Sequence, residues 1–315
     1  MLKVENLKKD FGQKTAVNKI SFELSRGEVM GFIGPNGAGK STAMRMITGF
    51  LPPTSGSVKV DGHDVESEPM KTKALIGYLP ENAPLYSNKS VTEFLELAAE
   101  LRGFHGGEKK KRVDEAVKKC FLEPVRYQSI DTLSKGYRQR TCFAQAIIHD
   151  PALLILDEPT DGLDPNQKHE VRNLIKEMGK NKAIIISTHI LEEVDAVTSR
   201  VVLISQGEKL FDGSPADFKK HSGDAGTFTL TVAGKDGKEL ENTLAAAEGV
   251  ADIEILKTAK NKSSVKFSCR KKSSPDKVRE AVAEVAVKKK WEILEFKENQ
   301  GDLNEVFAQL TRNRK

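Results

Sequence analysis

The stretch GPNGAGKST, from Gly34 to Thr42, fits the pattern G-x-x-x-x-G-K-[S/T] in full. The apolar run VMGFI precedes it, and Ser41 to Thr48 has the spacing of a helix, so the stretch is predicted to join a strand to a helix. Its glycines allow the backbone N–H groups to turn inward toward phosphate oxygens, because glycine accepts conformations that other residues avoid. The sequence therefore predicts a phosphate-binding loop.

The side chains of this loop complete a site for a nucleoside triphosphate. Lys40 is expected to neutralise charge on the β- and γ-phosphates, and the hydroxyl of Ser41 is a candidate ligand for Mg²⁺. The residues predicted to surround the nucleotide phosphates are Gly34, Pro35, Asn36, Gly37, Ala38, Gly39, Lys40, Ser41 and Thr42.

Polar residues follow two apolar, strand-like runs further along the chain. LLILDEP places Asp157 at the carboxyl end of a strand, where it can hold Mg²⁺ directly or through water. Glu158 beside it can polarise a water molecule for in-line attack. IIISTHI ends a second strand, and its His189 is expected beside Asp157 at the same sheet edge, as a donor toward the γ-phosphate.

Two other positions are candidates for contact with the nucleotide. Phe11 precedes Gly12, upstream of the loop, and is either a core residue or a stacking partner for adenine; we favour stacking. DTLSKGYRQR, Asp131 to Arg140, places Ser134 and Gly136 in a small-residue turn at a helix start, where unpaired N–H groups attract phosphate. Lys135 in that turn can add a cation. The chain thus carries two predicted phosphate sites.

Composition narrows the class of protein. The chain has 315 residues, 38% of them hydrophobic and 30% charged, which is typical of globular proteins and long enough for more than one domain. With a net charge of +5, the runs Lys109–Arg112 and Lys288–Lys290 are interpreted as solvated helix faces or ends, not nucleic-acid patches. No apolar run reaches the length of a membrane span and no secretory signal is evident, so a cytosolic protein is expected.

The cysteines are few and widely separated. Cys120, Cys142 and Cys269 include no CxxC pair, which argues against a zinc site or a disulfide framework. We expect them to be reduced, half-buried packing residues.

The pattern of apolar residues divides the first part of the chain. Residues 1–80 contain short apolar runs typical of strands. From Val91 to Asp150 the spacing becomes helical, and Ser90 with Glu93 has the signature of a capping box. Strand-like runs then resume, and RVVLISQGEKLFDG is typical of a hairpin. A helical insertion at about residues 82–150 is therefore predicted inside an α/β chain.

A second domain is predicted at residues 226–315, after a first domain that spans residues 1–220. Its strand-like and helix-like segments follow the order β-α-β-β-α-β, with a helix opening at Ser274 and a last helix at Leu303 to Arg312. That order predicts a small α+β domain that resembles a ferredoxin-like sandwich.

Taken together and in this order, the motifs resemble the nucleotide-binding subunit of an ABC transporter over residues 1–220. LSKGYRQR stands where that family has its LSGGQ signature, PTDGLDP is similar to its D-loop, IGYLPEN to its Q-loop, and the run ending in His189 to its switch histidine. The resemblance implies an α/β P-loop NTPase with a RecA-like core, an N-terminal antiparallel β subdomain and the helical insertion. It implies an ATPase that uses ATP and Mg²⁺.

The resemblance also implies partners. In the family, two cassettes pack head to tail, and the signature helix of one caps the γ-phosphate held by the loop of the other. Ser134 and Gly136 are then expected at the nucleotide of a second copy in a homodimer, which explains two half-sites in one chain. A separate transmembrane permease, a place on the inner face of the cell membrane and no nucleic-acid partner are implied as well.

Some features are specific to a subgroup. LPEN, LSKGYRQR and the closing DLNEVFAQLT are similar to the subunits that serve ABC-2 type exporters. Glu81 stands where the family usually has Gln, and a carboxylate can only accept hydrogen bonds, so its contact with metal or water differs from that of an amide. Tyr137 replaces the Gln of the signature.

Other functions remain as alternatives. One is an importer ATPase subunit with a regulatory C-terminal domain. The other is an ABC-type ATPase acting on ribosomes or DNA, against which the lack of internal duplication and of sustained heptads counts. A GTPase is disfavoured because the base-recognition motif Asn-Lys-x-Asp does not occur.

Overall fold

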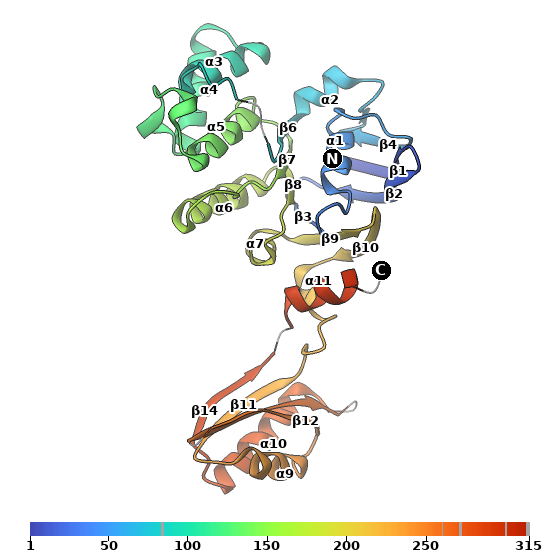
Figure 1. Cartoon of the computed structure of the whole chain (residues 1–315), viewed down its shortest axis with the longest axis vertical. Helices are drawn as coiled ribbons and strands as arrows, with labels where there is room; N and C mark the ends of the chain where they lie inside the picture. The colour runs from blue at the N-terminus through green and yellow to red at the C-terminus, as the bar shows by residue number, and fades with distance from the viewer. Residues whose placement is uncertain (83–84, 260, 271–272, 300, 313–315) are drawn as a thin grey trace. The chain divides into compact units, whose positions relative to one another are not determined.

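The computed structural model describes residues 1–82, 85–259, 261–270, 273–299 and 301–312. The chain divides into two compact units, Met1–Pro215 and Ala216–Arg312, each with a hydrophobic interior of its own (Figure 1). The domain limits at residues 220 and 226 stay predictions, and residues 313–315 of the predicted second domain lie outside the described residues.

The centre of the first unit is a largely parallel sheet. In order across the sheet, its strands are β10 (Glu208–Gly213), β9 (Arg200–Ser205), β3 (Val29–Ile33), β8 (Ala183–Ser187), β7 (Leu153–Asp157) and β6 (Ile76–Leu79). Strands β3, β7 and β8 are buried at every position, because packing covers both faces of the sheet. Strand β10 pairs antiparallel with β9 and forms the predicted hairpin.

An antiparallel sheet at the N-terminus confirms the predicted β subdomain. Its strands in order are β2 (Lys14–Leu24), β1 (Leu2–Phe11), β4 (Ser55–Val60) and β5 (His63–Asp64). Apolar and polar residues alternate along much of β4, so that Val58 and Val60 face the interior.

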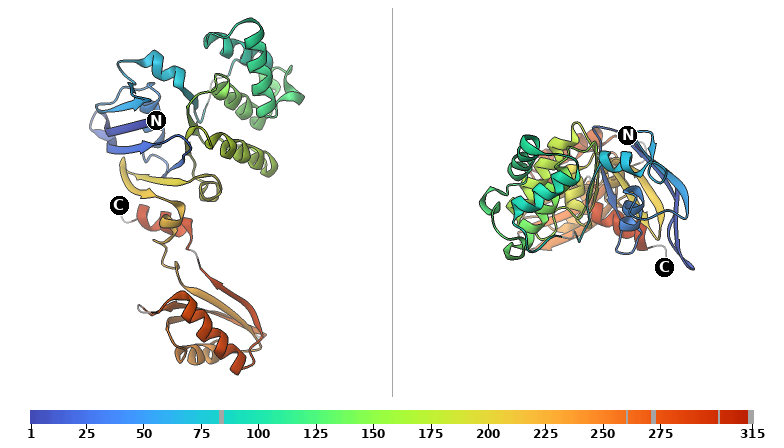
Figure 2. Two further views of the ribbon diagram at one scale, coloured as in Figure 1. Left: turned by 180° about the vertical axis from the view of Figure 1, so that it is seen from behind. Right: turned by 90° about the horizontal axis from the view of Figure 1, so that it is seen from above.

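Alternate residues of β7 and β8 belong to two different cores. Ile155 packs in a core with α1 (Lys40–Ile47) and the antiparallel sheet, whereas Leu154 packs with the inserted helices and α6 (Pro165–Gly179). Figures 1 and 2 show the antiparallel strands and the inserted helices on opposite sides of the central sheet. Packing on both faces holds the carboxyl ends of the strands in place between the two layers.

The helical insertion has the predicted elements, α3 (Val91–Leu101), α4 (Gly106–Lys119) and α5 (Lys135–Ile147). The capping box is confirmed: the Ser90 hydroxyl accepts from the Glu93 N–H at 3.3 Å, and the Glu93 carboxylate accepts from the Ser90 N–H at 2.7 Å. Shorter helices complete this unit: α2 (Pro69–Leu75), η1 (Glu123–Val125), η2 (Ile130–Thr132) and α7 (Leu191–Val197).

The second unit confirms the β-α-β-β-α-β order. Its elements are β11 (Phe228–Ala233), α9 (Gly237–Ala245), β12 (Val250–Ala259), β13 (Lys262–Cys269), α10 (Pro275–Lys288) and β14 (Ile293–Glu298), with α8 (Pro215–Lys219) before them and α11 (Leu303–Arg312) after them. The antiparallel sheet has the order β12-β13-β11-β14. Phe228, Leu230 and Val232 of β11 are fully buried under α9 and α10.

The cysteines differ in part from the expectation. Cys120 and Cys142 are buried in the core of the inserted helices and are not half-buried, while Cys269 is partly exposed. Burial raises the pKa of the Cys120 thiol to about 12 and that of Cys142 to about 12. Both are therefore unreactive packing residues at neutral pH.

The structure was also inspected for membrane spans. In the part of the chain that the structure describes, none of the helices combines the length and the apolar character needed to cross a bilayer.

Candidate nucleotide site

The loop GPNGAGKST joins β3 to α1, in the strand–loop–helix context that the motif requires. Two of its glycines leave no room for a side chain. A Cβ on Gly34 would lie 2.1 Å from the Ile204 carbonyl oxygen, and one on Gly39, whose φ is +104°, would lie 2.3 Å from the Ala16 carbonyl oxygen. The loop can therefore pack this closely only with glycine at both positions.

Lys40 is buried in the loop, with 8% of its surface exposed. Its Nζ donates to the carbonyl oxygen of Gly34 at 2.7 Å and to that of Pro35 at 3.2 Å. Burial lowers the pKa of the Lys40 ammonium, against the opposing effect of the Glu158 and Asp157 carboxylates. A buried cation satisfied mainly by carbonyl oxygens, beside N–H groups at a helix start, suits a ligand with several negative charges.

The other residues of the loop differ in their exposure to solvent. Asn36 and Gly37 are exposed, Ala38 is buried, and Ser41 and Thr42 in the first turn of α1 are partly exposed. The hydroxyl of Ser41 thus follows Lys40 directly at the helix N-terminus, where the helix dipole favours anions.

Asp157 is the last residue of β7 and is only 3% exposed. It pairs across the sheet with Ser187, the last residue of β8, and the Ser187 hydroxyl donates to Asp157 Oδ1. The prediction that these two strand ends lie side by side is confirmed. A buried carboxylate of this kind is the hard oxygen ligand that Mg²⁺ prefers, so Asp157 and Ser41 fit a magnesium site.

Glu158 and His189 lie together just beyond the same strand ends. Glu158 Oε1 is 3.0 Å from His189 Nδ1. Burial raises the pKa of the Glu158 carboxyl, and the neighbouring His189 opposes the rise. A half-buried carboxylate can accept a proton from water, and the exposed imidazole beside it can donate a hydrogen bond to an anion.

The backbone of Glu158 is held in an unusual conformation. Its φ of +50° lies in the left-handed region, which costs about 1 kcal/mol or more for a residue with a Cβ. Two hydrogen bonds hold it there: its N–H donates to the Ser187 carbonyl at 3.1 Å, and its carbonyl accepts from Gln139 Nε2 at 3.1 Å. Gln139 belongs to α5, so the helix that follows the signature turn contacts the segment carrying Glu158.

Phe11 and Glu81 are both exposed. Phe11 ends β1 with 52% of its surface accessible, and Lys9 Nζ lies 5.5 Å from its ring centroid. A ring exposed to this degree is open to stacking. Glu81 lies in the turn after β6, and its charge also acts to raise the pKa of Lys40.

The signature turn lies at the start of α5. Ser134 is exposed and caps the helix, accepting from the Tyr137 N–H at 3.3 Å. Lys135 Nζ lies 2.7 Å from Asp161 Oδ2, so this cation already has an acidic partner within the chain. Gly136 is buried, and a Cβ there would lie 2.7 Å from Gln167 Oε1. The turn therefore packs against residues 161–167, the D-loop and the start of α6.

Comparisons with known proteins agree with this geometry. The family model described as ABC transporter matches residues 17–161. The linearmycin resistance ATP-binding protein LnrL of Bacillus subtilis is 37% identical over 235 residues, which cover 74% of this chain and 76% of that protein. The Nod factor export ATP-binding protein I of Ralstonia nicotianae is 31% identical over 246 residues, covering 78% of this chain and 76% of its own length.

The chain belongs to the ATP-binding proteins of ABC transporters. This chain is also similar to a dimeric ATP-binding cassette solved in a post-hydrolysis state with ADP and phosphate. The TM-score is 0.64, with 26% identity, and the match covers 68% of this chain and 98% of that one. The predicted α/β P-loop NTPase fold is thereby confirmed, and the protein is an ATPase. The ABC ATPase binds ATP through a cassette of this fold.

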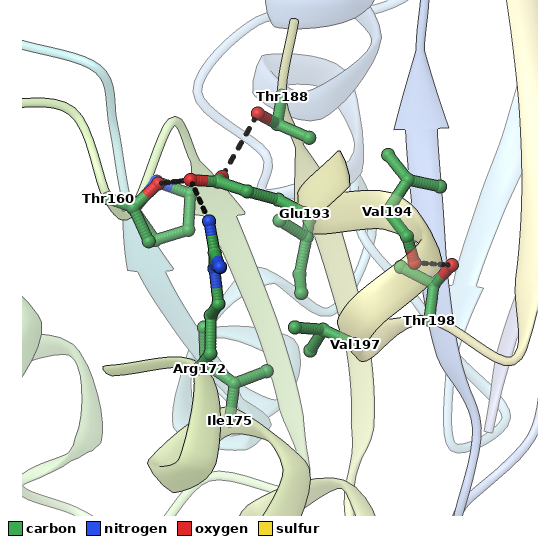
Figure 3. A pocket seen from close by; sticks show the side chains of 10 residues that line it. Thr160, Arg172, Ile175, Thr188, Glu193, Val194, Val197 and Thr198 are labelled. Carbon is green, nitrogen blue, oxygen red and sulfur yellow. Dashed lines mark hydrogen bonds and ion pairs between the residues drawn. The ribbon is translucent and has the colours of Figure 1, made fainter. Parts of the chain in front are cut away.

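Reasoning from the sequence missed one group of residues in this ABC ATPase. Thr160, Arg172, Thr188 and Glu193 are joined by hydrogen bonds and an ion pair, as Figure 3 shows. The sequence signals were the closeness of Thr188 to His189 and the place of Thr160 in the run PTDGLDP. Glu193 lies in the acidic run LEEVDAV, which is typical of a solvated helix face, and nothing in that pattern indicates burial.

Proposed function

We propose that this ATPase subunit serves an ABC-2 type exporter and drives a separate membrane permease. The similarity to a drug-resistance ATP-binding protein and to a Nod factor export protein, over about three quarters of each chain, carries the proposal. Two copies close head to tail around two Mg-ATP molecules, and hydrolysis reopens them. Because closure is a shift between two states, ATP must bind the closed state more tightly.

Each residue at the sheet edge has a proposed part in the reaction. The loop N–H groups and Lys40 bind the phosphates, and Ser41 and Asp157 hold Mg²⁺, which supplies positive charge next to the phosphates. Glu158 orients a water molecule and accepts its proton as the water attacks the γ-phosphorus. His189 donates toward the γ-phosphate, and Phe11 stacks on adenine while Glu81 contacts the metal or the water.

The position of the signature turn supports the proposed dimer. Ser134 is exposed, and its neighbours Lys135 and Gly136 contact the D-loop and Gln167 of their own chain. The free N–H groups at the start of α5 are then available to the nucleotide of a second copy. Contacts that form only on closure supply the difference in affinity that the population shift needs.

Mixing two inactive variants tests the head-to-tail arrangement. Lys40→Ala removes the loop cation, and Ser134→Arg places a large side chain on the signature turn. A mixed dimer keeps one intact site, because the wild-type loop of one chain meets the wild-type turn of the other. With random mixing we expect each variant alone to be inactive and the mixture to recover about a quarter of the wild-type ATPase rate.

The control is each variant mixed with itself at the same total concentration. No recovery in the mixture would show that each chain completes its own site, and it would remove the proposed dimer.

Purification of the tagged chain from membranes tests the export function. We expect a polytopic membrane protein to co-purify in amounts comparable to the chain, and deletion of the chain's gene to raise the cellular content of the cargo. A fall in cellular content would instead indicate an importer. Recovery of ribosomes or DNA with no membrane protein would contradict the transport role.

A further inference from the structure

Glu193 is a buried carboxylate that bonds to the two chain segments carrying Glu158 and His189. It lies on α7 with 4% of its surface exposed. Both carboxylate oxygens are 2.7 Å from the Thr160 hydroxyl, and Arg172 Nη2 is 3.1 Å and Lys168 Nζ 3.6 Å from Oε1. A buried charge is costly without hydrogen-bonding partners. These partners therefore determine where the Glu193 carboxylate lies.

The hydroxyl partners of Glu193 come from two separate loops. Thr160 is two residues beyond Glu158, and Thr188 immediately precedes His189. Thr188 Oγ1 donates to Glu193 Oε2 at 3.3 Å and accepts from the Ile190 N–H at 3.0 Å. Thr160 and Thr188 are 3% and 1% exposed, so water does not compete for these bonds.

Figure 3 shows how the group is arranged. The Glu193 side chain extends from α7 to lie between Thr160 on one side and Thr188 on the other, with Arg172 of α6 reaching the same carboxylate. One carboxylate thus joins the segment after β7 to the segment after β8.

We propose that Glu193 is a positioning residue for ATP hydrolysis. By holding both threonines at once, it keeps the chain segments of Glu158 and His189 in register, so that their side chains remain 3.0 Å apart. This inference rests on the proposed roles of Glu158 and His189. In this proposal Glu193 acts through the two segments that it holds by way of Thr160 and Thr188.

The substitution Glu193→Gln tests the proposal in the full-length protein. The glutamine side chain has the size of the glutamate side chain. Its NH₂ group, however, can only donate hydrogen bonds, so it cannot accept one from the donors around the carboxylate. We expect kcat for ATP to fall at least about tenfold, because small displacements of reacting groups are costly, while the affinity for a fluorescent ATP analogue stays within about threefold. Glu192→Gln, on the exposed face of the same helix, is the matched control and keeps the wild-type kcat.

If Glu193 only supported the fold, kcat would not fall while the affinity for the ATP analogue stayed the same. The substitution would lower the fraction of folded protein, and so the number of binding sites, without changing the rate per bound ATP. Thermal unfolding of each variant, followed by circular dichroism, measures the folded fraction.

The variants Thr160→Val and Thr188→Val give a second measurement that does not depend on Glu193→Gln remaining folded. Each removes one hydroxyl and nearly preserves shape, and each should lower kcat. The double variant Thr160→Val with Glu193→Gln should lose little more than the larger single loss, because both changes break the same connection.

An unchanged kcat in Thr160→Val, or fully additive losses in the double variant, overturns the proposal. Glu158→Gln is measured in parallel. Should Glu158→Gln keep full turnover, the proposed catalytic roles fail; should Glu158→Gln be inactive while Thr160→Val and Glu193→Gln match wild type, only the positioning role of Glu193 fails.

Discussion

Replacing Glu158 with Gln is expected to leave ATP bound and to lower its hydrolysis by at least about 100-fold, the usual contribution of a general base. The amide occupies the same volume but cannot take a proton from water. The backbone bonds of Glu158, to the Ser187 carbonyl and from Gln139, do not involve the side chain, so the local conformation should persist.

Two measurements check this result. Phosphate release gives the loss of turnover, and size-exclusion chromatography with Mg-ATP should show a stable dimer, because the closed state can no longer reopen through hydrolysis. Glu177→Gln, at an exposed position on α6, serves as the control. Undiminished turnover in Glu158→Gln would remove Glu158 from its proposed role.

The second large effect is expected for Lys40→Ala, which should weaken ATP binding by about 100-fold, the equivalent of one strong charge-assisted hydrogen bond. Lys40 is the buried cation of the loop, and its Nζ contacts the carbonyl oxygens of Gly34 and Pro35. Its loss removes positive charge from the phosphate site and leaves those carbonyl groups without their donor.

Titration with a fluorescent nucleotide measures the affinity, and thermal unfolding shows that the variant is folded. Lys14→Ala, an exposed lysine on β2, is the matched control, because it removes the same charge outside the loop. If Lys40→Ala bound ATP within about threefold of wild type, the loop would not be the nucleotide site.

The parts of the fold that could be predicted depend on residues close together in the chain. The capping box at Ser90 and Glu93 uses positions three apart, and the strand–loop–helix unit around Lys40 is contiguous. The uniformly apolar run before Asp157 predicted a strand, and β7 forms there with every position buried. Local conformation and periodicity determine such features, so they are visible in one sequence.

The sequence also predicted that two strand ends lie side by side. Two apolar runs that each end in polar residues indicated parallel strands with a common edge, and the register of Asp157 with Ser187 agrees. The order of strands across the sheet was not predicted, because it depends on connections between segments distant in sequence.

The sequence alone therefore determined the phosphate loop, the acidic strand end and the class of fold, since each depends on neighbouring residues whose conformations are determined locally. Only the tertiary structure decided that Lys135 pairs with Asp161, that Gln139 holds the backbone of Glu158, and that Glu193 is buried between two loops. The contacts of Lys135 with Asp161, of Gln139 with Glu158 and of Glu193 with Thr160 join residues 26, 19 and 33 positions apart. Only the packing of the sheet and helices brings these residues within hydrogen-bonding distance.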